Sequence, residues 1–426
     1  MRLNANILST GFLYILGLIS SYFLTAIIIK FYGTEQLGIF TTTTRLLKLL
    51  EVFCLLGMNI SIVKFVSEDL LEKKRNIFPL YSFSAKKIIL ISLPISIIIF
   101  LSSGYLANSI FGNEKYVMLF KAVSIVLPFS SLKLLNEELL RSLSYFKISE
   151  FFKRFGLMFF TIIIFFLFQK NDDINFTVTE YYLSIICVLF FVSSFYVLSK
   201  ILTFSYTRLD SELKQNYKNI SNSLFLSLFI LTLNSQQTIY LLESFSSSSN
   251  VGIFQFYFRI AALCSFPKII SNNILGPQIA PLLKDNKLKD LQSKINNFVK
   301  YSTGLTLAIS LLIYILHEHI FLYFGEEFLT YKNVFNLILF SQIFNVLTGP
   351  CTLMLQMGNN QKILLRNNII GLLIGLILNT FLIMNYGLSG AGLGFALSIF
   401  ILNIMNVFSV KKIYNISTIF KLKNVS

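Results

Sequence analysis

Two arginines lie at equivalent positions inside long apolar runs of this chain. The triplet Gly-Ile-Phe at residues 38–40 is followed by Arg45, and the same triplet at residues 252–254 is followed by Arg259. The two copies are 214 positions apart in a chain of 426 residues. An arginine inside a membrane is costly and usually has a function. Because guanidinium groups bind phosphate and carboxylate in a bidentate manner, the pair predicts a pathway for an anion.

Two further charged residues follow Arg45 on the same helical face. Lys48 and Glu51 lie three and six residues beyond it, so the three side chains cover a face about 120° wide. Counted from Gly38, they lie at depths of roughly 10, 15 and 20 Å, which brackets the membrane midplane. We interpret Glu51 either as the charge partner of Lys48 or as a carboxylate that binds a coupling ion. In a purely structural alternative, Lys48 and Glu51 form an ion pair that stabilises the helix bundle, and the Arg45 side chain extends to the membrane–water interface.

A stripe of alternating charge ends another apolar run. Lys133, Glu137 and Arg141 are spaced four residues apart, with Glu138 beside them. Residues four apart are neighbours on a helix, so the stripe predicts either an interfacial ladder of ion pairs or an inner gate.

Catalytic and metal-binding patterns are weak. The two histidines, His317 and His319, point to opposite sides of a helix, so a three-ligand zinc site is not expected. The four cysteines occur singly inside apolar runs, and no phosphate-binding loop is present. We therefore expect no metal, no cofactor and no enzymatic activity.

The composition requires a membrane protein. The chain is 55% hydrophobic and 13% charged, with a mean hydropathy of +0.70, whereas a soluble domain carries about 25% charged residues. Windows of about 20 apolar residues predict an all-α protein with twelve membrane-spanning helices, at 11–31, 41–63, 88–107, 117–137, 155–169, 181–202, 220–242, 251–280, 298–317, 331–355, 367–385 and 391–410.

The basic residues predict the orientation of these helices. With the N-terminus in the cytoplasm, most Lys and Arg residues of the connecting segments fall on the cytoplasmic side, and four fall outside: Lys30, Lys115, Lys170 and Lys332. This positive-inside pattern predicts that both termini are cytoplasmic. The net charge of +16 is therefore interpreted as attraction to the anionic bilayer surface, and a nucleic-acid partner is not expected.

The repeat predicts two pseudo-symmetric lobes of six helices, at residues 1–213 and 214–426. Because six is even, both lobes enter the membrane from the same side, with a cleft expected between them. The lobes differ in charge, since the counterparts of Lys48 and Glu51 are Ala262 and Ser265.

Several segments resemble the Wzx-type flippases that export O-antigen and capsule repeat units. The N-terminal ones are residues 31–40 (FYGTEQLGIF), 56–59 (LGMN) and 63–66 (VKFV), and the C-terminal ones are residues 358–362 (GNNQK) and 385–391 (NYGLSGA). The resemblance covers the whole chain and places it in the superfamily, called MATE/MOP, that also contains MATE drug antiporters and lipid II flippases.

This resemblance implies a V-shaped, MATE-like arrangement of the two lobes in the bacterial cytoplasmic (inner) membrane. It also implies alternating access and export of an undecaprenyl-pyrophosphate-linked oligosaccharide, bound in a cationic central cavity. Arg45, Lys48 and Arg259 match the substrate-binding role by position. A polysaccharide polymerase and a chain-length regulator are the implied protein partners.

Two alternative functions, one from the same superfamily and one from another class, predict features that this sequence lacks. A cation-coupled efflux antiporter of the same superfamily usually carries an acidic residue in the first span, but residues 11–31 contain none. A membrane polymerase or ligase needs a large outer loop, and the predicted outer segments are short.

Overall fold

The computed structural model describes residues 2–72, 76–168, 177–201 and 209–419, so Lys170 lies outside this part of the chain. The described residues form α-helices with short turns of π-helix or 3-10 helix beside some of them, and no β-strand occurs among these residues. An all-helical chain is expected for a membrane protein, because a helix satisfies its own backbone hydrogen bonds inside lipid.

The helices of the first half are α1 (Arg2–Leu55), α2 (Met58–Glu72), α3 (Ile77–Tyr105), η1 (Leu106–Ile110), α4 (Lys115–Ser142), α5 (Phe146–Glu150), η2 (Phe151–Phe155), α6 (Gly156–Phe168) and α7 (Val178–Ile201). The remaining helices are α8 (Ser211–Phe245), α9 (Ser248–Ala262), η3 (Leu263–Ser265), α10 (Phe266–Lys284), α11 (Leu288–Phe324), α12 (Glu327–Thr330), α13 (Lys332–Leu347), α14 (Cys351–Met357) and α15 (Gln361–Tyr414).

Nine continuous helical segments among the described residues are long and apolar enough to cross a membrane. The pair α13 and α14, bent by 45° at a short break, adds a tenth. Two of the nine, α1 and α15, are each two helices merged across a kink. Counting the two limbs of each kinked helix separately gives twelve segments, in the order expected from the sequence.

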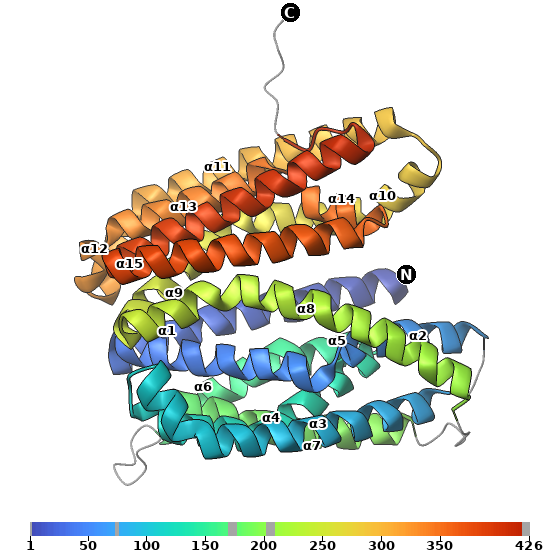
Figure 1. The fold of residues 1–426 in the computed structure, drawn as a ribbon, viewed down its shortest axis with the longest axis horizontal. Helices are drawn as coiled ribbons and strands as arrows, with labels where there is room; N and C mark the ends of the chain where they lie inside the picture. The colour runs from blue at the N-terminus through green and yellow to red at the C-terminus, as the bar shows by residue number, and fades with distance from the viewer. Residues whose placement is uncertain (1, 73–75, 169–176, 202–208, 420–426) are drawn as a thin grey trace, which may run out of the picture. The chain divides into compact units, whose positions relative to one another are not determined.

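Glycine creates both kinks. Gly33 adopts φ 80° and ψ −176°, and Gly387 adopts φ 54° and ψ −128°. Residues with a Cβ rarely occupy this part of backbone space, which glycine enters at little cost. The chain reverses direction at each glycine, so α1 and α15 are helical hairpins (Figure 1).

The predicted end of the second span is wrong. The second span was expected at residues 41–63, but its helix ends at Leu55, and α2 begins separately at Met58. Leu56 and Gly57 both have positive φ, which ends the helix. The apolar residues of α2 extended the hydropathy window beyond the true helix end.

The chain divides into two compact units, unit 1 (Met1–Thr232) and unit 2 (Leu233–Ser426). The boundary falls inside α8, which begins at Ser211. Early in α8, the Ser221 hydroxyl donates to Ser61 of unit 1 (2.9 Å). Later in α8, Asn234 donates to the carbonyl of Asn368 in unit 2 (2.8 Å).

Each unit packs around one central helix. In unit 1, α4 contacts α1, α2, α3 and α7, and in unit 2, α13 contacts α9, α11 and α15. Large apolar side chains point outward from the peripheral helices, for example Leu101 (77% exposed), Phe195 (79%) and Ile377 (71%). Such exposure is costly in water and is expected of a surface that contacts lipid.

Candidate functional site

The two repeated arginines occupy the same place in their helices. Arg45 lies eleven residues beyond Thr34, where the second limb of α1 begins, and Arg259 lies eleven residues beyond Ser248, the first residue of α9. At 1.5 Å per residue each is about 16 Å along its helix, near the middle of a hydrocarbon core about 30 Å thick. Both side chains are half-buried.

Glu51 is held by the central helix of unit 1. The hydroxyl of Ser130 on α4 donates a hydrogen bond to the Glu51 carboxylate. Lys48, Lys133 and Glu137 also act on Glu51 electrostatically. We call these five residues, Lys48, Glu51, Ser130, Lys133 and Glu137, the unit-1 charge cluster. The predicted charged face of α1 is therefore joined to the predicted stripe of α4.

The centre of this cluster is a buried ion pair. Lys133 (5% exposed) and Glu137 (0% exposed) bond to each other one helical turn apart. The Ser149 hydroxyl donates to the backbone carbonyl of Glu137 (2.8 Å), which fixes α5 against this turn. Burying two charges is costly unless they are paired, so each member of the pair requires the other.

The third residue of the predicted stripe has a different partner. Arg141 pairs with Glu138 (Nε to Oε2, 3.2 Å), and Lys153 of η2 donates to the same carboxylate (2.8 Å). Glu137 faces the interior, whereas Arg141 remains half exposed. The structure therefore brings Lys133 and Glu137 together, and it places Arg141 in a separate cluster nearer the helix end.

The corresponding segments of unit 2 are also joined by polar side chains, although Gln342 lies two residues before Phe344, the counterpart of Ser130. Ser265, the counterpart of Glu51, donates to Gln342 Oε1 on α13 (2.8 Å). One turn later, Lys268 Nζ donates to the backbone carbonyl (2.5 Å) and side-chain Oδ1 (2.9 Å) of Asn345. Among the described residues, Lys268 forms no ion pair with an acidic group.

The residues that correspond to Lys268 and Asn345 lie 214 positions earlier, in unit 1. They are Cys54 and Ser131, whose thiol and hydroxyl lie side by side. Each unit thus carries polar contacts between corresponding helical segments, which include a carboxylate, Glu51, in unit 1 and an ammonium group, Lys268, in unit 2.

Sequence reasoning missed Ser130 and Asn345, because a serine or asparagine in an apolar run is common and carries little signal. The 214-residue offset was the available signal, since it relates Ser131 to Asn345 and Cys54 to Lys268.

The described residues contain no group of three or more His, Cys, Asp and Glu side chains that could hold a metal ion. His317 is buried in an aromatic cluster instead, stacked on Phe335 (16° between ring planes) and in edge contact with Phe321. Its Nδ1 lies 2.5 Å from the carbonyl of Tyr314.

Solved structures share this architecture along nearly the whole chain. Lipid II flippase MurJ in an inward closed conformation matches with a TM-score of 0.75 and 17% identity, over 96% of this chain and 87% of that one. An inward-facing MATE multidrug resistance transporter of the MOP superfamily matches at 0.74 and 11% identity, over 95% and 94%. A MOP superfamily transporter from Pyrococcus furiosus, described by the reverse polarity of its binding pocket, matches at 0.63 and 14% identity, over 96% and 95%.

No protein-family model and no curated protein matches this sequence. The likeness is therefore one of fold, and it confirms the expected all-helical, MATE-like fold class. The chain has the all-helical fold of the MurJ and MATE transporters of the MOP superfamily.

Proposed function

We propose that this protein is a flippase that moves an anionic lipid-linked oligosaccharide across the bacterial cytoplasmic membrane. The proposed substrate is an undecaprenyl-pyrophosphate-linked repeat unit of a surface polysaccharide. The observation that carries the proposal is the pair Arg45 and Arg259, each near mid-membrane depth at the same place in its unit.

The balance of charge favours an anionic substrate. The unit-1 charge cluster together with Arg45 contains three cations and two carboxylates, and one carboxylate, Glu137, is bonded to Lys133. Arg259 and Lys268 add two cations in unit 2. In a medium of low dielectric constant, such an excess attracts a diphosphate far more strongly than in water. Arg45, Lys48 and Arg259 are therefore the proposed headgroup-binding residues.

Transport would use alternating access, with the lipid chain remaining in the bilayer while the headgroup crosses. Glu51 is either the charge partner of Lys48 or the group that binds a coupling ion. Lys133 and Glu137, followed by Arg141, form the proposed inner gate. A polymerase and a chain-length regulator would then use the exported repeat unit.

A second candidate is cation-coupled efflux of a drug or other small molecule. It is favoured by the similarity to a MATE multidrug resistance transporter and by the two membrane-embedded carboxylates, Glu51 and Glu137. The two functions require opposite substrate charges, since an efflux antiporter for cationic drugs needs a site with excess negative charge.

Deletion of the gene in its source bacterium distinguishes the two. We expect loss of surface polysaccharide and accumulation of the lipid-linked repeat unit in the membrane, both restored by the wild-type gene. Unchanged surface polysaccharide, together with increased sensitivity to cationic dyes, would instead support the efflux function.

A further inference from the structure

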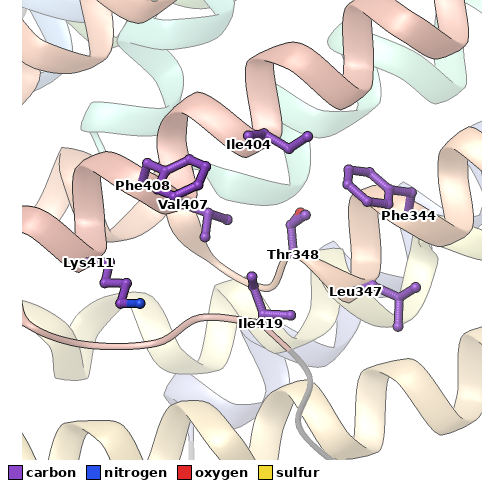
Figure 2. Close-up of a pocket in the computed structure, with 8 residues that line it drawn as sticks. All are labelled: Phe344, Leu347, Thr348, Ile404, Val407, Phe408, Lys411 and Ile419. Atoms are coloured by element: carbon purple, nitrogen blue, oxygen red, sulfur yellow. The ribbon is translucent and has the colours of Figure 1, made fainter.

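An apolar groove lies on the membrane-spanning surface of unit 2. Its volume is about 330 Å³, and it is lined by Phe344, Leu347, Thr348, Ile404, Val407, Phe408, Lys411 and Ile419. Figure 2 shows these side chains around the groove, with Lys411 and Phe408 on the same helix. None of them belongs to the charged residues described above.

Two helices supply the walls of the groove. Ile404, Val407, Phe408 and Lys411 have the i, i+3, i+4, i+7 spacing of one helical face, on the second limb of α15. The residues on the facing wall come from the end of α13, just before the helix is interrupted at Gly349. Phe344 and Phe400, with ring centroids 4.4 Å apart, hold the two helices together beside the groove.

The segment after α15 supplies the third wall. Gln292 of α11 pins this segment through Ser417, accepting from its backbone nitrogen (2.8 Å) and donating to its carbonyl (2.7 Å). Thr418 packs so closely on Gly349 that a Cβ atom added to Gly349 would lie 2.1 Å from the carbonyl oxygen of Thr418. The groove is therefore built by fixed contacts around Ile419.

The chemistry of the lining selects an amphipathic occupant. The Thr348 hydroxyl is already used, since it donates to the carbonyl of Asn345 (2.8 Å). Lys411 thus carries the one charge among the eight lining residues, in the last turn of its helix. Phe408 (66% exposed) and Ile404 (43%) present apolar surface to the surroundings. A cation at the end of a membrane helix attracts the phosphate of an anionic lipid.

We propose that this groove binds one acyl chain of an anionic phospholipid, whose phosphate contacts Lys411. An apolar cavity of about 150 Å³ holds a benzene ring, so roughly a dozen chain carbons fit in the groove. This size suits an acyl chain, whereas a polyprenyl chain would place only a fraction of its length there. The inference stands independently of the proposed transport function.

The absence of tryptophan from the chain allows a direct test. Phe408→Trp places the single tryptophan of the chain in the groove, where it can be excited selectively over the tyrosines. Phe381→Trp places one on the first limb of α15, outside the groove lining, at a similar exposure (63% against 66%). The full-length variants are reconstituted in phosphatidylcholine vesicles that contain small fractions of brominated phosphatidylglycerol or brominated phosphatidylcholine, whose acyl bromines quench tryptophan.

For the Phe408→Trp variant, half of the quenching should occur at about a fivefold lower fraction of brominated phosphatidylglycerol than of brominated phosphatidylcholine. This factor is the affinity ratio expected when one lysine contacts an anionic headgroup. The Phe381→Trp variant should be quenched equally by both lipids. Adding Lys411→Gln to Phe408→Trp should remove the preference, whereas adding Lys412→Gln should keep it. Lys412 is the matched control, because it is exposed and lies next to Lys411 but outside the groove lining.

Equal quenching of the Phe408→Trp variant by the two lipids would overturn the proposal. Equal effects of Lys411→Gln and Lys412→Gln would also overturn it. An absence of quenching of this variant by either lipid would overturn it as well, because no acyl chain would then reach the groove.

Discussion

Arg45 and Arg259 each lie eleven residues beyond the first residue of a membrane helix, Thr34 in unit 1 and Ser248 in unit 2. Gly33, which has positive φ, precedes one helix, and Ser247, which caps the N-terminus through its side chain, precedes the other. Different residues therefore start the two helices at corresponding positions. This equivalence is why we treat the two arginines as one functional pair.

Replacing either arginine should slow transport without unfolding the protein. Arg45→Ala and Arg259→Ala should each lower the transport rate by about tenfold or more, because a buried contact to a charged group is lost. Lysine at either position should restore part of the rate, since it keeps the charge but not the bidentate geometry. Surface polysaccharide, normalised to membrane-inserted protein, measures this effect.

Arg366→Ala is the control for these variants, because Arg366 is an exposed arginine in the first turns of α15. An equal loss of polysaccharide in the control would mean that any removed positive charge impairs the protein. That result would refute the proposed special role of Arg45 and Arg259 in transport.

Breaking the buried pair Lys133–Glu137 should destabilise unit 1. Glu137→Gln leaves the Lys133 ammonium without its carboxylate, at a cost of about 3–5 kcal/mol. The double variant Lys133→Met/Glu137→Gln removes both charges and should recover most of the lost stability. A thiol-reactive dye can follow thermal unfolding, because Cys54, Cys264 and Cys351 are buried. A double variant with a Tm no higher than that of Glu137→Gln would refute the pairing.

The hydrogen bond from Ser130 to Glu51 should stabilise the contact between α1 and α4. Ser130→Ala removes the donor to a carboxylate, which costs about 1.5–3 kcal/mol, whereas Ser130→Thr retains a hydroxyl. Ser124→Ala is the matched control, because the Ser124 hydroxyl donates only to the carbonyl of Lys121 on its own helix (2.6 Å). The account requires a clearly lower Tm for Ser130→Ala than for Ser124→Ala.

The kink at Gly33 should depend on its backbone conformation alone. A Cβ at Gly33 would meet nothing within 4 Å, yet φ is 80° there. Gly33→Ala should therefore cost about 1–3 kcal/mol through strain rather than through a clash. Gly104, which is helical and has equally open space, is the comparison, and Gly104→Ala should leave the Tm unchanged or raise it. Equal Tm values for the two variants would contradict this explanation.

The membrane character, the order of the spans and the arginine pair could be predicted from the sequence because they depend on hydropathy, charge and one long-range repeat. The end of the second span could not, since Leu56 and Gly57 stop the helix by conformation while the apolar character continues. The partner of Arg141 was also undetermined, because Glu137 and Glu138 are adjacent and only packing decides which one faces inward. The donor Ser130 lies 79 residues from Glu51, so only the fold brings them together.

Reconstituted transport tests the central claim most directly. Purified protein is placed in liposomes that contain a pyrophosphate-linked polyprenyl saccharide with a fluorescent sugar, and a membrane-impermeant quencher reports the fraction in the outer leaflet over time. We predict that wild-type protein equilibrates the two leaflets and that Arg45→Ala/Arg259→Ala does so at least about tenfold more slowly. Equal rates for the two proteins, or a wild-type rate no faster than that of protein-free liposomes, would contradict the account.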